Sequence, residues 1–313
     1  MRKLILMAVA AVMATSAFAQ GTVKKVRIYK GEKIAYEEKY DDVDSIVFVD
    51  VPVLPEGALS GKFSVSDSKK VHFSKGNLQA GFDGTKWNWF FAPNQWDYVG
   101  NATANTSITG DGIVSVNDTV DLFGWSTAAT KYGINKSTEN STYSGNFEEW
   151  GNNIVEGWYT LSTDEWGYLF HGRDKADELF GLGSVNGING TIILPDDWTL
   201  PTGAIFNNAK DNNLVWQSED YYHNSNSNNF SHNTYTAEQW DTMEKAGAVF
   251  LPAAGKRSGT IMNDVGSFGY YWSSTPRTVY RTYYVIFGSS NLFPQSDSGR
   301  SSGHSVRLVR EVK

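Results

Sequence analysis

Residues 162–170, with the sequence STDEWGYLF, decide the fold class because they join a helix start to an apolar helix face. Ser162 and Glu165 form a capping box, in which each side chain accepts a hydrogen bond from the other residue's backbone N–H. The next apolar residues are spaced to fall on one side of a helix: Trp166, Leu169 and Phe170. The stretch therefore predicts a short amphipathic helix that ends near Gly172.

A second helix is predicted further along the chain. Residues 236–239 (TAEQ) form another capping box and lead into Trp240 and Met243. Gly247 then stands where a left-handed C-cap would end the helix. Both predicted helices are short and amphipathic.

The rest of the larger region is predicted to be sheet and loop. Residues 191–194 and 248–251 are apolar runs bounded by proline and predict buried strands. Residues 100–157 are rich in Asn, Ser, Thr and Gly, which favours long loops. Three further regions indicate antiparallel strands and turns: 62–73, 87–91 and 269–309. The predicted class is α+β, with antiparallel sheets, two short helices and long loops.

The N-terminal region has a different character. Residues 1–19 have a basic start, an apolar run and an Ala-Phe-Ala ending, which is typical of a secretory signal peptide. Residues 20–50 predict a small β-hairpin segment with a third short strand. Residues 51–57 contain two prolines and are interpreted as a linker. The main domain is then expected over residues 58–313, with no membrane span in the mature chain.

Composition excludes several function classes. The chain has 313 residues, a formal net charge of −7 and no cysteine. Loss of Arg2 and Lys3 with the signal peptide would bring the charge to about −9, so binding to nucleic acid is not expected. Without cysteine there is no disulfide, no thiol nucleophile and no Cys-ligated metal. Export would place the protein in the periplasm, in the medium or on the outer cell surface.

No pattern in the sequence indicates a catalytic or metal site. The five histidines are scattered, without the spacing of a zinc site. Asp196 and Asp197 could ligate calcium, although a turn or capping role is the preferred interpretation. No Gly-x-Ser-x-Gly elbow occurs, and paired carboxylates such as Glu148 and Glu149 fit a solvated surface. We therefore expect no catalytic residue, no cofactor and no metal.

Collinear blocks over most of residues 58–313 resemble exported surface proteins of gut Bacteroidetes. The resemblance implies a C-type-lectin-like fold, in which two helices flank a twisted antiparallel sheet with long loops. Residues 42–48 (DVDSIVF) also resemble an N-terminal segment of such proteins. The blocks are FSVS at 63–66, VHFSKGNLQ at 71–79, DLFGW at 121–125, LPDDW at 194–198, VFLPAAG at 249–255, YWSST at 271–275 and SVRLVR at 305–310.

The closing segment is similar to the variable region of target proteins of diversity-generating retroelements. In that family, copying errors at adenines scatter Asn-type codons over many residue types, but never to Lys, Glu, Gln, Met or Trp. Residues 273–304 contain no Lys, Glu, Met or Trp and one Gln, Gln295. The resemblance implies a fixed frame that includes Trp272, Arg300, Gly303 and Arg307, with changeable positions between its members.

The changeable positions are the predicted ligand-binding residues. Tyr284 and Ile286 alternate with Val285 and Phe287, so one pair is expected to face solvent if the other faces the core. Exposed aromatic and hydroxyl side chains would suit a binding surface. An alternative is that Tyr284 and Phe293 belong to the core. The predicted set is Arg277, Tyr280, Tyr284, Ile286, Ser290, Phe293, Asp297, Ser298, Ser301 and His304.

The expected function is that of a receptor-like or adhesin-like protein, secreted or at the cell surface. Its C-terminal surface would bind a protein or a glycan, and the protein would not be an enzyme. One alternative is a carbohydrate-active or modifying enzyme on the same fold. Another is a structural component of a surface appendage, with the N-terminal hairpin as an assembly element.

Overall fold

The chain divides into two compact units, Met1–Val53 and Leu54–Lys313. The protein is described here from a computed structural model, which covers residues 24–45, 54–106, 115–134, 143–155, 157–217, 221–223 and 229–313. The predicted signal peptide and residues 46–48 of the predicted third strand lie outside these residues. No helix within them is long and apolar enough to cross a bilayer.

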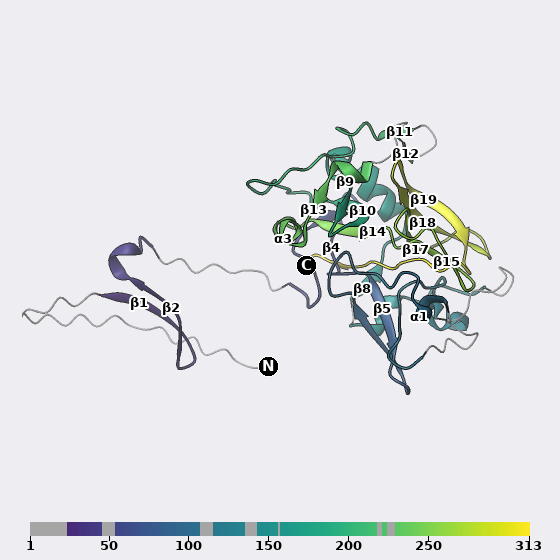
Figure 1. The fold of residues 1–313 in the computed structure, drawn as a ribbon, viewed down its shortest axis with the longest axis horizontal. Coiled ribbons are helices and arrows are strands. Elements are labelled where there is room, and N and C mark those ends of the chain that lie inside the picture. The colour runs from purple at the N-terminus through teal and green to yellow at the C-terminus, as the bar shows by residue number, and fades with distance from the viewer. Residues whose placement is uncertain are drawn as a thin grey trace, which may run out of the picture. The chain divides into compact units, whose positions relative to one another are not determined.

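The smaller unit contains the predicted hairpin. Strands β1 (Lys25–Lys30) and β2 (Lys33–Lys39) pair antiparallel, and a 3-10 turn follows at Tyr40–Asp42 (Figure 1). Gly31 occupies the turn with a φ of +67°, a conformation that glycine adopts without steric cost. Ile28 and Tyr36 face each other across the two strands and are about half exposed.

Both predicted helices are present in the larger unit. Helix α2 (Thr163–Gly167) begins at the Ser162–Glu165 capping box and continues as a π-helical turn, Tyr168–Gly172. Helix α3 (Ala237–Lys245) begins at the capping box of Thr236 and Gln239. Gly247 follows it with a φ of +100°, as the C-cap signal predicts. A further single turn of helix is α1, Thr103–Thr106.

Within the described residues, the strands of the larger unit form five sheets, so the α+β class with several antiparallel sheets and few short helices is confirmed. One sheet has the order β3 (Phe63–Ser64), β4 (Lys70–Phe73), β20 (Leu308–Glu311), β8 (Trp158–Thr160), and joins the beginning and end of the unit. A second has the order β6 (Trp87–Phe91), β5 (Leu78–Phe82), β7 (Thr119–Val120).

The other three sheets include the predicted buried strands. One has the order β13 (Thr234–Tyr235), β9 (Phe180–Val185), β10 (Ile188–Ile193), β14 (Val249–Pro252), with β13 parallel to β9. A small one pairs β15 (Lys256–Ser258) with β16 (Ile261–Asn263). The last has the order β11 (Val215–Gln217), β12 (Tyr221–His223), β19 (Asn291–Gly299), β18 (Arg281–Gly288), β17 (Gly269–Pro276).

The five-stranded sheet is covered on both faces along its central part. Val285 and Phe287 of β18 point into a core cluster that also contains Trp166 of α2. Tyr284 points the other way, into a second cluster with Trp125 and Trp272. In β19 a bulge falls opposite residues 284–286 and contains Pro294, a position where proline disrupts no ladder hydrogen bond.

Two residues of the expected fixed frame lie inside this unit. The indole Nε1 of Trp272 donates to the Phe123 carbonyl at 2.6 Å, and its side chain is buried. The buried Arg307 guanidinium donates to Gln95 Oε1 at 2.9 Å and to Asn77 Oδ1 at 3.3 Å. Both are therefore scaffold residues, as the sequence predicts.

Candidate ligand-binding face

The turn that joins β17 to β18, residues 277–280, is held by a local network of hydrogen bonds. The backbone N–H groups of Arg277 and Thr278 both donate to the Arg281 carbonyl at 3.0 Å. The Thr278 hydroxyl accepts from the backbone N–H of Arg281 at 3.0 Å and of Tyr280 at 3.3 Å. A threonine hydroxyl used in this way replaces backbone partners that a turn otherwise lacks. The turn is therefore ordered by its own residues.

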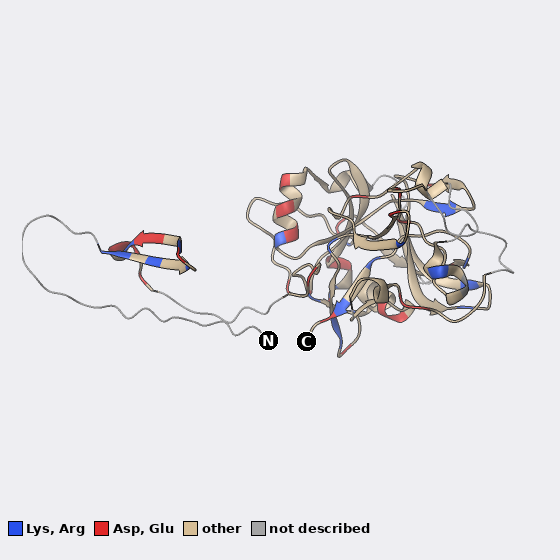
Figure 2. Cartoon of the chain, turned by 90° about the horizontal axis from the view of Figure 1, so that it is seen from below, with Lys and Arg blue, Asp and Glu red and all other residues tan. Residues whose placement is uncertain are grey.

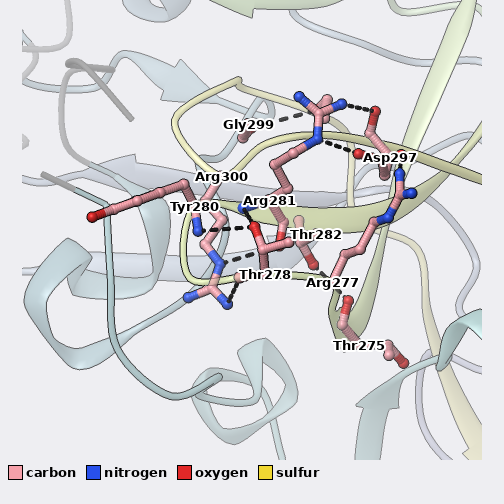
Figure 3. Close-up of polar contacts among 10 residues, drawn as sticks. Thr275, Arg277, Thr278, Tyr280, Arg281, Thr282, Asp297, Gly299 and Arg300 are labelled. Atoms are coloured by element: carbon pink, nitrogen blue, oxygen red, sulfur yellow. Dashed lines mark hydrogen bonds and ion pairs between the residues drawn. The ribbon is translucent and has the colours of Figure 1, made fainter. Parts of the chain in front are cut away.

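Arg300 fixes the turn from beneath (Figure 3). Its guanidinium donates to the Thr278 carbonyl at 2.6 Å and to the Gly145 carbonyl at 3.0 Å, and it lies 4.3 Å from the Trp125 ring centroid. Desolvation lowers the pKa of Arg300. Carbonyl oxygens and an aromatic ring thus compensate this buried cation, and its bond to the Thr278 carbonyl ties the turn to the core.

The outer side of the turn presents apolar and cationic groups together. Val279 is 60% exposed and Tyr280 is 46% exposed. Arg277 and Arg281 both form ion pairs with the Asp297 carboxylate of β19, as Figure 3 shows, and Arg281 Nη2 also donates to the Asp297 carbonyl at 3.0 Å. We call the surface formed by Arg277, Val279, Tyr280, Arg281 and Asp297 the turn face.

The turn face has one excess positive charge and borders a shallow hollow. The hollow has a volume of about 390 Å³, and its lining includes Asn146, Thr278 and Arg300. Most of the ribbon of the larger unit in Figure 2 has the colour of uncharged residues, whereas Arg277 and Arg281 lie four residues apart at this turn. The arrangement can hold an extended polar ligand through arginine donors and the Tyr280 ring.

Five of the ten predicted binding residues lie at or beside this end of the sheet. Arg277, Tyr280 and Asp297 belong to the turn face. Ser298 follows Asp297 in β19 and pairs with Thr282, and Ser301 directly follows Arg300. All five are exposed or partly exposed.

The prediction that Tyr284 and His304 lie on an exposed surface is wrong. Tyr284 is 8% exposed and His304 is 1% exposed, and their rings lie 4.7 Å apart in the core cluster with Trp272. The His304 ring stacks on Trp272 at 4.0 Å. Burial, together with the positive charge of Lys256, lowers the pKa of His304 well below its usual value. Because both faces of the sheet are covered, alternation along β18 leaves no solvent side at this point.

The remaining three predicted residues lie away from the turn. Ile286 pairs with Phe293, and Ser290 lies in the tight turn between β18 and β19. The partly buried Phe293 stacks on Tyr221 of β12 at 4.4 Å. Ile286 is roughly 17 Å along β18 from Arg281 at the usual rise per residue. The ten predicted residues therefore do not form one surface.

Three residues were missed from the sequence: Val279 and Arg281 of the turn face, and Tyr283 beside it. Arg277 lies 5.9 Å from the Tyr283 ring centroid, so this ring supports the arginine pair. The sequence did contain a sign that Arg281 has a partner. Residues 274–304 include four charged side chains, and Asp297 is the one acid among them. A lone acid in a predicted hairpin indicates a partner on the neighbouring strand.

Comparison of the chain with protein-family models, with curated proteins and with solved structures found no match. Within the described residues there is also no group of three or more His, Asp or Glu side chains placed to hold a metal ion. The geometry of the turn face therefore provides the basis for a functional assignment.

Proposed function

We propose that this is an exported ligand-binding protein with a C-type-lectin-like domain, in which the turn face binds a protein or a glycan outside the cell. The observation that carries the proposal is the exposure of Val279, Tyr280 and two arginines at a turn whose Thr278 carbonyl is bonded to the buried Arg300. A rigid backbone lowers the entropy lost on binding, and tyrosine and arginine are the side chains most enriched at binding hot spots.

The expected retroelement diversification belongs to the same proposal. The frame residues Trp272, Arg300 and Arg307 are buried. The changeable positions Arg277 and Tyr280 are exposed. A Cβ added to Gly303 would lie 2.9 Å from the Arg257 side chain, so this position has little freedom to change. A buried frame with changeable residues on an outer turn is what a diversified receptor would need.

The proposal is tested by binding of the purified protein to an array of glycans and to a library of extracellular proteins. We expect a ligand that is lost in the double variant V279A/Y280A and weakened at least tenfold in R281A. The melting temperature should stay within about 2 °C, because exposed residues contribute little to stability. Ile261→Ala, at another exposed apolar residue, is the matched control. Ligands that bind V279A/Y280A as well as the parent protein would contradict the proposal.

A second candidate function has a specific observation in its favour. The hairpin β1–β2 exposes Ile28, Tyr29, Ile34 and Tyr36, each about half accessible to solvent. A two-stranded sheet with exposed apolar side chains and free edges can add strands from other chains. The chain would then be a structural component that assembles through its hairpin. Analytical ultracentrifugation tests this assembly. A sedimentation coefficient that remains that of a monomer over a 100-fold rise in protein concentration, and that is the same in I28K, would exclude assembly through the hairpin.

A further inference from the structure

A pocket of about 530 Å³ lies at the edge of the five-stranded sheet opposite to β17. It is formed between residues 171–177, which follow helix α2, and the paired strands β11 and β12. The turn face uses none of its residues. We call it the His171 pocket, and the lining side chains that matter here are His171, Arg173, Lys175, Asp177, Lys210 and Trp216.

One wall of the pocket is aromatic and fixed in place. The His171 ring lies flat on the Trp216 indole, with centroids 3.8 Å apart and an interplanar angle of 7°. Tyr222, which pairs with Trp216 across β11 and β12, holds the indole from another side at 4.8 Å. Trp216 also packs against the core cluster beneath it. A flat aromatic wall suits the apolar C–H face of a sugar ring.

The remaining charged side chains of the lining are mostly cationic. Lys175, Lys210 and Arg173 line it together with one carboxylate, that of Asp177. A neighbouring pocket, which shares Arg173 and Lys175, is balanced by three carboxylates, those of Asp174, Glu178 and Asp196. Glu178 and Asp196 of that neighbouring pocket also pair with Lys210 and Arg173, so Lys175 is the cation of the His171 pocket that is left for an anion.

Two of these cations are available to a ligand. No hydrogen bond or ion pair holds the Lys175 ammonium among the described residues, and Lys175 has a φ of +52°, an uncommon backbone conformation for lysine. The Lys210 ammonium contacts Glu178 at 2.8 Å, but both side chains are exposed, so the pair is weak. A ligand carboxylate can take the place of Glu178 as the ion-pair partner of Lys210 with little loss of interaction energy.

Arg173 adds positive potential beneath the pocket. It is 4% exposed, and its guanidinium donates to the Leu194 carbonyl at 2.9 Å, to the Leu179 carbonyl at 3.1 Å and to Asp196 at 3.3 Å. Its Nε has no hydrogen-bond partner in the described structure. Desolvation lowers the pKa of Arg173 to about 10, which leaves it charged at neutral pH. One donor of this buried cation is therefore left unused, while the Asp196 carboxylate balances its charge.

We propose that the His171 pocket binds a carboxylate-bearing sugar, a uronic acid either free or within an acidic glycan. The carboxylate lies at Lys175 and Lys210, above Arg173, and the sugar ring packs on the wall made by His171 and Trp216. The proposal is independent of the proposed function, because the turn face shares no residue with this pocket.

The test is calorimetric titration of the purified protein with D-glucuronate and D-galacturonate, beside the neutral sugars D-glucose and D-galactose. We expect at least one uronate to bind with saturation and at least tenfold more tightly than its neutral counterpart. Lys175→Gln and His171→Ala should each weaken uronate binding at least fivefold. Both side chains are exposed, so these variants should fold.

Lys131→Gln is the matched control, because Lys131 is also exposed, has a φ of +48° and does not line the pocket. Ile261→Ala, which lies in neither site, should bind uronate normally, and uronate binding that is lost in R281A but kept in K175Q would place the carboxylate at the turn face and overturn the proposal. Equal binding of neutral sugar and uronate, no saturable binding, or unchanged binding in K175Q would overturn the proposal. Sulfate that binds as tightly as uronate and is insensitive to H171A would also overturn it.

Discussion

Tyr280 and Tyr284 are four residues apart, and their surroundings differ completely. Tyr280 lies on the outer side of the turn, whereas Tyr284 contacts Tyr270, Trp272 and His304 inside the core. We expect Tyr284→Ala to lower the free energy of unfolding by about 3 kcal/mol, because truncation of a buried aromatic ring leaves a cavity. Tyr280→Ala should change it by less than about 0.5 kcal/mol. Urea denaturation of the two variants measures both, and equal losses would contradict the assignment.

His304 makes stability depend on pH with a definite sign. Its pKa in the folded protein lies well below 6.5, so the folded state keeps the imidazole neutral where the unfolded chain takes up a proton. The resulting stability is fully present above pH 6.5 and is lost as the pH falls toward the folded pKa. The loss approaches about 1.4 kcal/mol per pH unit. We expect the free energy of unfolding to decrease through this group between pH 7.5 and 5.5.

The H304Q variant separates the contribution of His304 to the pH dependence of stability from that of Asp121. Burial raises the pKa of Asp121 to about 6, so the folded state binds its proton first and acidification stabilises through that group. His304→Gln keeps Asp121 and removes the imidazole. The difference in unfolding free energy between parent and H304Q should therefore shrink by about 1 kcal/mol from pH 7.5 to 5.5. A difference that is constant with pH would show that His304 does not titrate in this way.

At the scale of elements, the helices could be predicted from the sequence and the surroundings of the strands could not. Ser162 with Glu165, and Thr236 with Gln239, are local signals, and both capping boxes occur as predicted. The period-two pattern of β18 shows which residues share a face, but it cannot show whether a second layer covers the other face. Tyr284 was misplaced for that reason.

The capping box at the start of α2 is expected to stabilise the protein. The Ser162 hydroxyl accepts from the Glu165 backbone N–H at 3.2 Å, and Glu165 Oε2 accepts from the Ser162 N–H at 2.8 Å. We expect Ser162→Ala to lower the free energy of unfolding by about 1 kcal/mol, and Ser162→Asp to restore most of it. Thermal denaturation with both variants checks this. An unaffected S162A would mean that packing of Trp166 alone determines where the helix begins.

At the scale of the whole molecule, the aromatic content is explained by several clusters rather than one core. Trp166, Trp272 and Trp240 each belong to a different cluster of buried residues. Among the described residues of the larger unit, these clusters leave few aromatic side chains well exposed, namely Phe90 and Tyr280. The side chains of the two proposed binding sites, the turn face and the His171 pocket, come from turns and strand edges. Their positions depend on long-range pairing, which residue spacing alone does not reveal.

Sequence variation in the gene would test the diversified turn and the buried positions together. If the C-terminal segment is diversified, sequencing of codons 270–310 across a population should show variation at Arg277 and Tyr280, where any side chain can be accommodated. Trp272, Gly303 and Arg307 should stay fixed, because their surroundings are closed. Positions 284 and 304 provide the sharper comparison. Buried among aromatic rings, they should be restricted to a few residue types even if their codons are copied with errors. Free variation at positions 284 and 304 together with a constant turn would contradict both the diversified turn and the burial of Tyr284 and His304. A segment that is the same in all sequences would exclude diversification, but would leave the burial of these two residues unaffected.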